Sequence, residues 1–178
     1  MKIGLLGGSF NPPHLGHVHI SNLAIKNLGL DQIWWMPTKQ NPFKDPSVYE
    51  DYSARISQSL TLTQLNHRIY IKEFDDIYTV DLLSKLNRKY PNVTFFWIMG
   101  SDNLVNFHKW KNFKLLLNKV SLAIFSRETS LRHLKKTKSW GFIAKSNYKI
   151  FFSKNLDISS TEIRNNLISS AKTKNNIL

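Results

Sequence analysis

The chain has 178 residues, of which 42% are hydrophobic and none is cysteine, so we expect residues 1–178 to form one domain without disulfides, thiolate metal sites or thiol nucleophiles. No apolar run approaches the ~20 residues that a membrane span needs, which predicts a soluble, cytoplasmic protein that does not bind membranes. The net charge is +13, and residues 101–178 carry 15 Lys and Arg against 4 Asp and Glu, a bias that favours anionic partners.

The first expected strand, Ile3–Leu6, leads into the most informative stretch of the sequence: Gly7-Gly8-Ser9-Phe10-Asn11-Pro12-Pro13-His14-Leu15-Gly16-His17. Two glycines at a strand end let backbone N–H groups approach a phosphate, because no Cβ intervenes. The two prolines delay the next helix until about Leu15 or Gly16, which places both histidines near its first turn and its positive dipole end.

These two histidines leave other interpretations open. A His pair on one helix turn can also bind a metal ion or simply cap the turn. The flanking glycines and prolines favour a phosphate site. The spacing matches neither a Walker motif nor the Gly-x-Gly-x-x-Gly fingerprint of dinucleotide-binding domains.

Expected helices and strands alternate along the first half of the chain. Periodicity predicts a helix over 18–28 ended by Gly29, and then a strand over 32–36. A proline-broken loop over 41–46 precedes a helix capped by Ser53 that runs to about Leu65. A strand over 68–72 and a helix over 79–89, capped by Thr79, come next.

The second half continues the alternation. The strongly apolar stretch 93–99 is typical of a central strand buried on both faces, and a helix over 111–117 and strands over 120–125 and 148–152 follow it. The sequence therefore predicts a doubly wound, mainly parallel α/β sheet of about five to six strands with helices on both faces. Ligands would bind at the carboxyl ends of the strands.

Polar residues follow the expected strands, at the end of the sheet where ligands bind. They are Lys44, Tyr78, Thr79, Asp81, Asp102 and Arg127. A second phosphate site is indicated by Ile158-Ser159-Ser160-Thr161-Glu162-Ile163-Arg164, which gathers hydroxyls and a guanidinium around one helix start. A capping box of Ser159 with Glu162 would explain only part of this stretch.

The stretch Gly7–His17 resembles the (T/S)-F-(D/N)-x-x-H-x-G-H signature of the nucleotidyltransferase superfamily with a HIGH-type motif. The Gly-Gly opening is most similar to the nicotinate-nucleotide adenylyltransferase family, and Ser159–Arg164 is similar to the superfamily motif I-S-S-T-x-(I/V)-R. Asn11 stands where Asp is common, so a carboxylate that could hold a cation is missing. The resemblance implies a Rossmann-like nucleotidyltransferase fold.

Shorter resemblances lie between these motifs. Lys44 closes a segment similar to P-x-x-x-x-P-x-K, and Tyr78-Thr79-Val80-Asp81-Leu82-Leu83 is similar to Y-T-x-D-T-L. Gly100 and Asp102 with Trp110 resemble G-x-D-x(7)-W, in which the tryptophan stacks on a pyridine ring. From the residues alone, a tryptophan in the place of Trp110 is more often a core side chain, and Thr79 is more often a helix cap than a ligand. Lys44 is as often a solvated loop charge as a ligand.

The resemblance implies adenylyl transfer from ATP to nicotinate mononucleotide, with Mg²⁺ carried by ATP and no metal held by the protein. His14 and His17 would be the catalytic donors. The implied ATP-binding residues are Gly7, Gly8, Ser9, Phe10, His14, His17, Gly100, Asp102, Arg127, Ser159, Ser160, Thr161 and Arg164. The implied mononucleotide-binding residues are Asn11, Lys44, Tyr78, Thr79 and Trp110.

Two other functions remain open. Pantetheine-phosphate adenylyltransferase is the nearest related activity, although it lacks the double glycine and the Trp110 region. The basic run Arg132–Lys138 is compatible with a nucleic-acid-binding protein, but the sequence holds no recognisable RNA or DNA module, and no specific nucleic acid is expected. The sequence does not decide the oligomeric state, nor the choice between nicotinate and nicotinamide mononucleotide.

Overall fold

The computed structural model describes residues 1–39, 49–126 and 131–152. Within these ranges one parallel sheet has the strand order β3-β2-β1-β4-β5-β6. The strands are β1 (Lys2–Gly8), β2 (Gln32–Pro37), β3 (Ile69–Ile71), β4 (Thr94–Gly100), β5 (Ser121–Ser126) and β6 (Tyr148–Phe152). The predicted doubly wound parallel sheet is confirmed.

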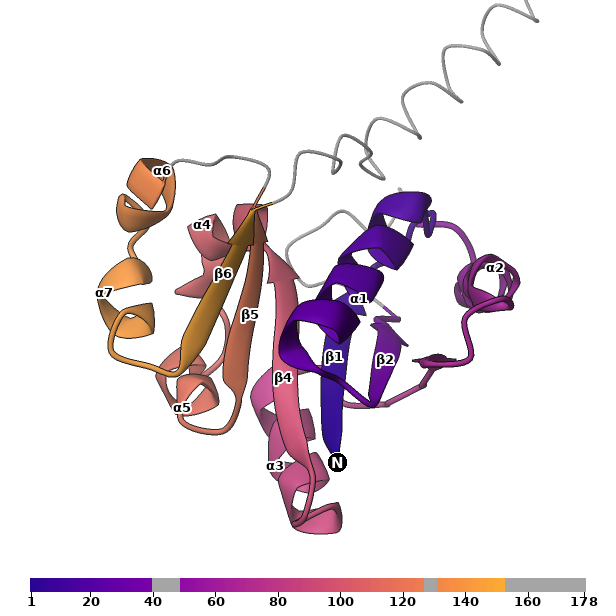
Figure 1. Cartoon of the computed structure of the whole chain (residues 1–178), viewed down its shortest axis with the longest axis horizontal. Coiled ribbons are helices and arrows are strands. Elements are labelled where there is room, and N and C mark those ends of the chain that lie inside the picture. Colours follow the sequence, from indigo (N-terminus) through magenta and orange to yellow (C-terminus); the bar gives the residue numbers. More distant parts are fainter. Residues whose placement is uncertain (40–48, 127–130, 153–178) are drawn as a thin grey trace, which may run out of the picture.

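Helices cover both faces of this sheet, with α1 on one side and α3 and α5 on the other (Figure 1). The longer helices are α1 (Leu15–Leu28), α2 (Tyr52–Thr63) and α3 (Thr79–Lys89). The short ones are η2 (Ser101–Asn103), α4 (Leu104–Phe107), α5 (Phe113–Leu117), α6 (Leu131–Lys135) and α7 (Trp140–Ile143).

Alternation along the strands creates two hydrophobic layers, because successive side chains of a strand point to opposite faces. Trp34 and Trp97 belong to the layer under α3. Trp35 and Ile98, their neighbours in the chain, belong to the layer under α1. The central strands are therefore buried on both faces, which is why they appear in the sequence as continuous apolar runs.

Of the three predicted helix caps, one is confirmed and two are wrong. Gly29 ends α1 in the left-handed conformation (φ 61°, ψ 48°), as predicted. Ser53 and Thr79 are not caps, because Asp51 and Tyr78 hold the N-cap positions. The Asp51 carboxylate accepts the backbone N–H of Ser53 at 2.9 Å, and an aspartate serves this purpose as well as a serine.

The helix expected over 111–117 begins later, at Phe113. The residue before it, Asn112, adopts a left-handed conformation (φ 49°), so the chain cannot continue a right-handed helix through that position. The short helices α4, α6 and α7 were not predicted. Segments of four or five residues carry too little periodicity to be recognised in a sequence.

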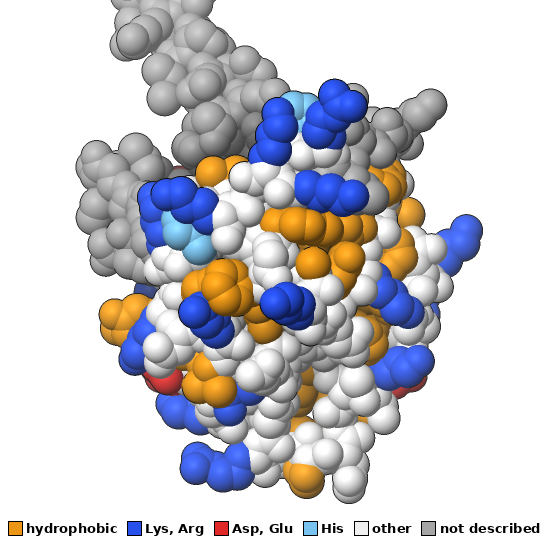
Figure 2. Space-filling view, turned by 90° about the vertical axis from the view of Figure 1, so that its left-hand side faces the viewer, with side chains coloured by type: hydrophobic (Ala, Val, Ile, Leu, Met, Phe, Trp, Pro, Cys, Tyr) orange, Lys and Arg blue, Asp and Glu red, His pale blue; other side chains and the backbone are white. Residues whose placement is uncertain are grey.

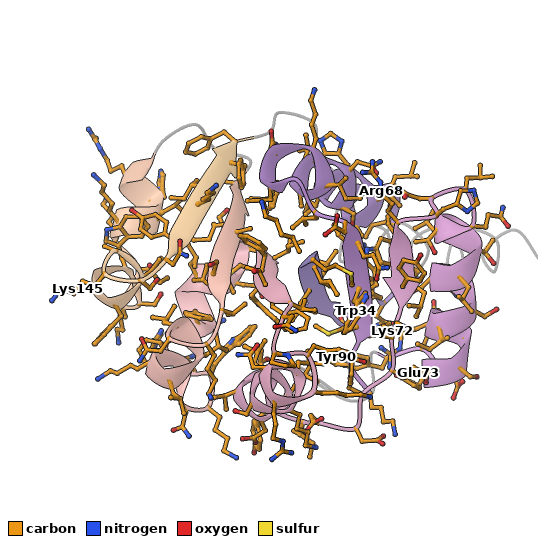
Figure 3. The ribbon with its side chains drawn as sticks, turned by 60° about the horizontal axis from the view of Figure 1, so that its bottom comes forward. Trp34, Arg68, Lys72, Glu73, Tyr90 and Lys145 are labelled. Atoms are coloured by element: carbon orange, nitrogen blue, oxygen red, sulfur yellow. The ribbon has the colours of Figure 1, made fainter. Side chains whose placement is uncertain are left out.

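Aromatic rings pack around Trp34 on the α3 face of the sheet. The rings of Trp34 and Tyr90 meet edge to face at 5.8 Å between centroids, and the Lys72 ammonium lies 5.7 Å from the Trp34 ring (Figure 3). Trp34 lies in the middle of β2, and Lys72 directly follows the last residue of β3. These contacts therefore stabilise the packing of β2 and β3 against the end of α3.

The face formed by α6 and α7 carries many Lys and Arg side chains and few acidic ones (Figure 2). In the basic run Arg132–Lys138 the cationic side chains are exposed, whereas Leu134 is buried in the core. This arrangement is that of a solvated helix face. Among the described residues, no helix is long and apolar enough to cross a membrane.

Candidate active site

The strand order reverses between β1 and β4, which lie side by side at the centre of the sheet. In open α/β sheets, ligands bind at such a reversal, outside the carboxyl ends of the strands. Leu6 of β1 pairs with Ile98 of β4, and both strands end two residues later, at Gly8 and Gly100. The fold therefore brings the double-glycine motif beside Gly100 and Asp102, which the sequence separates by about ninety residues.

Gly7 is required by a close approach of β4. A Cβ built on Gly7 would lie 2.7 Å from Cη2 of Trp97, well inside van der Waals contact. Trp97 in turn packs edge to face against Trp110, with 5.9 Å between ring centroids. A contact chain thus runs from the end of β1 to the tryptophan expected at the mononucleotide site.

We expect Gly7→Ala to destabilise the fold by about 1–3 kcal/mol, because the buried Trp97 ring must shift to admit a methyl group. Gly141→Ala is the matched control, since nothing lies within 4 Å of a Cβ at that position. Urea denaturation of both variants measures the difference. Equal stability of the two variants would contradict the packing seen at Gly7.

Beyond the glycines the chain turns sharply at Phe10, a buried residue with a positive φ of 46°. A left-handed conformation costs a non-glycine residue roughly 1–2 kcal/mol, so other contacts must hold it. The Phe10 ring stacks on Trp35 at 4.9 Å and lies 4.6 Å from the His17 ring. This aromatic stack joins β2, the motif loop and the first turn of α1.

The two histidines take the positions that the prolines predict. His14 is the N-cap of α1, and its backbone N–H donates to Nδ1 of His17 at 3.1 Å. The ring centroids of the pair are 3.9 Å apart. Since Nδ1 of His17 accepts this hydrogen bond, its ring is the neutral tautomer with the proton on Nε2, assigned here from the geometry.

Burial, and to a smaller extent the charge of the neighbouring His14, lower the pKa of His17 from 6.5 to about 3. The hydrogen bond with the His14 backbone acts in the opposite direction but is the weaker influence. His17 is therefore a neutral Nε2–H donor at physiological pH. Such a donor can bind an anionic oxygen without carrying a formal charge.

Stability should depend on pH through this group. Between pH 6.5 and about 3, the unfolded chain binds a proton at His17 and the native protein does not, so the free energy of unfolding falls as pH falls. We expect a loss of about 1–2 kcal/mol from this group between pH 6.5 and 5. Urea denaturation at both pH values should show a smaller loss in His17→Asn than in His67→Asn, whose parent side chain is exposed.

Asn11 is almost fully buried, and its side chain links the motif loop to the segment before α2. Its Oδ1 accepts the backbone N–H of Glu50 at 2.9 Å, just before α2. An amide oxygen is sufficient for this contact. The structure thus gives Asn11 an anchoring contact within the protein, while its expected contact with the mononucleotide stays a prediction.

Three of the other expected mononucleotide residues, Tyr78, Thr79 and Trp110, lie on the α3 side of the sheet. Tyr78 is the exposed N-cap of α3, and Thr79 is the first residue of that helix. The Lys111 ammonium lies 4.3 Å from the Tyr78 ring and 3.1 Å from the Asp81 carboxylate. These contacts connect the start of α3 with the segment that directly follows Trp110.

Six expected site residues lie outside the described ranges: Lys44, Arg127, Ser159, Ser160, Thr161 and Arg164. Among the residues that the structure does describe, no group of three or more His, Asp or Glu side chains is placed to hold a metal ion. The described part of the site offers backbone donors, two histidines, aromatic rings, the polar side chains of Asn11 and Thr79, and one carboxylate, Asp102.

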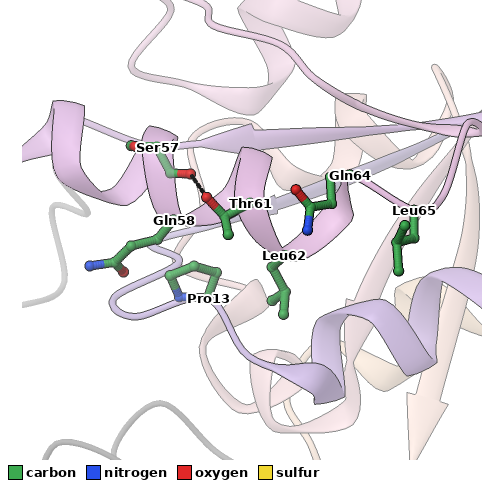
Figure 4. A pocket seen from close by; sticks show the side chains of 7 residues that line it. All are labelled: Pro13, Ser57, Gln58, Thr61, Leu62, Gln64 and Leu65. Carbon is green, nitrogen blue, oxygen red and sulfur yellow. Dashed lines mark hydrogen bonds between the residues drawn. The ribbon is translucent and has the colours of Figure 1, made fainter.

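A groove of about 490 Å³ lies beside the motif, between Pro13 and α2 (Figure 4). Its lining consists of Pro13, Ser57, Gln58, Thr61, Leu62, Gln64 and Leu65. Thr61 donates its hydroxyl to the Ser57 carbonyl at 3.1 Å, within the helix. Because this lining carries no charged side chain, the groove lacks the cations that a phosphate site favours.

Comparison with known proteins decides the family. Residues 5–166 match the model of the cytidylyltransferase-like family. The chain is 40% identical over 147 residues to the protein named probable nicotinate-nucleotide adenylyltransferase in Agrobacterium fabrum, covering 80% of this chain and 78% of that one. The chain belongs to the nicotinate-nucleotide adenylyltransferase family. The relative of the same name in Methylorubrum extorquens strain PA1 is 41% identical over 131 residues, which is 71% of this chain and 70% of that one.

Solved structures of this family have the same fold. The Plasmodium falciparum nicotinic acid mononucleotide adenylyltransferase complexed with NaAD superposes with a TM-score of 0.74 at 22% identity, covering 92% of this chain and 82% of that chain. At this identity the likeness supports the fold alone. The predicted membership of the nicotinate-nucleotide adenylyltransferase family and the Rossmann-like fold are both confirmed.

One buried cation behind the motif was missed by the sequence analysis. Arg55 lies on the inward face of α2 and is only 1% exposed. A single arginine among apolar and hydroxyl positions on the buried side of a helix is the signal that could have revealed it. Its partners are backbone carbonyls from separate segments, which no sequence pattern specifies.

Proposed function

We propose that this protein transfers the adenylyl group of ATP to nicotinate mononucleotide, forming nicotinate adenine dinucleotide and pyrophosphate. The observation that carries the proposal is the neutral His17, held by His14 at a glycine-rich strand end where the sheet order reverses. Membership of the nicotinate-nucleotide adenylyltransferase family supports the same activity.

The chemistry needs no protein nucleophile. A phosphate oxygen of the mononucleotide attacks the α-phosphorus of ATP in line, the bond to the β-phosphate breaks, and pyrophosphate leaves. The Nε2–H of His17 would donate to an α-phosphate oxygen as negative charge builds there. His14, at the start of the same helix, would bind a neighbouring phosphate oxygen near the positive end of the α1 dipole.

The remaining roles come from the sequence motifs. We assign the β- and γ-phosphates to Ser160, Thr161 and Arg164, and the phosphate of the mononucleotide to Lys44. Trp110 would offer its ring to the pyridine. Mg²⁺ would arrive bound to ATP as part of that substrate. We also propose the cytoplasm as the site of action.

The direct test supplies the purified protein with Mg-ATP and nicotinate mononucleotide and measures pyrophosphate release. We expect turnover with this substrate. A parallel reaction with phosphopantetheine separates the proposal from pantetheine-phosphate adenylyltransferase. Turnover of phosphopantetheine alone would contradict the proposed function, and a third reaction with nicotinamide mononucleotide defines the preference between the two pyridine substrates.

A further inference from the structure

Arg55 of α2 lies directly behind the motif loop and donates only to backbone carbonyls. Its Nη1 donates to the carbonyls of Ser9 and Thr38, the second at 2.9 Å. Its Nη2 donates to the Lys39 carbonyl at 3.1 Å, and its Nε to the Glu50 carbonyl at 3.2 Å. One side chain thus connects the loop after β1, the end of β2 and the start of α2.

These contacts form a closed ring of hydrogen bonds. From Ser9 the chain runs two residues to Asn11, whose Oδ1 accepts the N–H of Glu50. The carbonyl of Glu50 accepts from Arg55, which returns to the carbonyl of Ser9. This ring holds the Ser9–Phe10 peptide in place, because the peptide cannot rotate without breaking the hydrogen bond from Arg55 to the Ser9 carbonyl.

The fixed planes decide which way the amide groups of the loop point. In a trans peptide the C=O and the following N–H point in opposite directions. The Ser9 carbonyl points to Arg55, so the Phe10 N–H points away from α2. The Gly8 carbonyl points to Thr38, whose N–H donates to it at 2.9 Å, so the Ser9 N–H likewise points away from β2.

The Phe10 N–H has no hydrogen-bond partner within the described residues. It belongs to the left-handed residue that follows the glycines and precedes the two histidines of α1. A rotated Ser9–Phe10 peptide would turn a carbonyl oxygen toward the phosphates instead, and that oxygen would repel them. The orientation that Arg55 imposes is the one that suits an anion.

An arginine is required for this task because its planar guanidinium presents five donors in a rigid fork. The rings of Tyr49 and Tyr52 lie 5.1 and 5.3 Å from the guanidinium carbon and hold the fork in place. Within the described residues Arg55 makes no salt bridge. Its N–H groups donate to backbone carbonyls and hold those carbonyls in position. A lysine has the same charge but cannot donate in the same planar arrangement, so it cannot replace the arginine.

We propose that Arg55 is a positioning residue for adenylyl transfer, which orients the Ser9–Phe10 peptide so that the Phe10 N–H donates to a phosphate oxygen. The role in turnover rests on the proposed function. The orientation of the amide does not, because it can be measured with a phosphate ligand alone.

The first experiment uses the wild-type protein and pyrophosphate as the probe. In ¹H–¹⁵N spectra, saturating pyrophosphate should shift the Phe10 amide resonance strongly and leave that of Gly141, on the distant α7, in place. An unchanged Phe10 resonance in protein that binds pyrophosphate would overturn the proposal. So would protein that does not bind pyrophosphate at all, and neither result depends on turnover of the mononucleotide.

The second experiment compares Arg55→Lys with Arg88→Lys, a matched change at an exposed site in the last turn of α3. We expect kcat of Arg55→Lys to fall by about tenfold or more, with less than about a threefold change in KM for either substrate, because a misplaced donor acts on the transition state. The kcat of Arg88→Lys should stay at the wild-type value.

The outcomes separate the two proposals. Wild-type protein without turnover defeats the proposed function, and the amide experiment then still tests the orientation. If the wild-type protein is active, and folded Arg55→Lys has a kcat within twofold of that of Arg88→Lys, the proposed role of Arg55 is overturned. If Arg55→Lys does not fold, the shift of the Phe10 amide resonance in the wild-type protein is the test of the proposal.

Discussion

His17→Ala lowers kcat of adenylyl transfer by about 10²-fold or more, because it removes a donor whose contact strengthens as charge builds on the α-phosphate. The effect is expected in kcat because the neutral Nε2–H binds the ground state only weakly. Pyrophosphate release under saturating Mg-ATP and nicotinate mononucleotide measures it. The neutral state of His17 also predicts no ionisation of this residue near pH 6–7 in the profile of kcat against pH.

His67→Ala is the matched control, since His67 is exposed in the turn between α2 and β3. Its kcat should equal that of the wild type. Because the His17 ring also packs against Phe10, thermal melts of both variants are needed to separate lost chemistry from lost packing. A folded His17→Ala protein with the kcat of the control removes His17 from the mechanism.

Trp35→Ala destabilises the fold by about 3–5 kcal/mol, the range for removing a large, fully buried aromatic side chain. Trp35 stacks on Phe10, and its indole N–H donates to the Ser21 hydroxyl at 2.8 Å. That hydroxyl donates to the His17 carbonyl, also at 2.8 Å. Removing the ring therefore removes support from the motif loop and from the first turn of α1 together.

Urea denaturation of Trp35→Ala and Trp35→Phe measures the two contributions. Phenylalanine retains most of the stacking surface but cannot donate to Ser21, so we expect it to lose about 1–2 kcal/mol. Phe142→Ala, at a half-exposed surface ring, should change stability by a smaller amount. A loss below about 1 kcal/mol for Trp35→Ala would contradict the buried stack.

Much of the fold could be predicted because its strands are buried on both faces. The stretch that becomes β4 has few polar residues, and such a run has few alternatives to a central strand. The parallel topology followed from helices alternating with strands. The caps Asp51 and Tyr78 could not be predicted for two different reasons. Asp51 and Ser53 are both good N-cap residues, and Tyr78 holds its N-cap position without a side-chain hydrogen bond, which leaves no sequence signal.

The candidate site was predictable where it depends on residue type and local geometry. Two prolines before a helix are enough to place His14 and His17 at its first turn. The neutral tautomer of His17 depends on a backbone contact that only the folded turn creates. The roles of Ser160 and Arg164 remain predictions, since those residues lie outside the described ranges.

Because Gly7 lies so close to Trp97, the side-chain size that one of these positions tolerates depends on the side chain at the other. A methyl group at position 7 needs room that only a smaller ring at position 97 can give. Trp97→Phe should therefore reduce the cost of Gly7→Ala, and the double variant should be more stable than the two separate losses predict. Natural variation in this family should follow the same rule, with larger residues at position 7 accompanied by smaller ones at position 97.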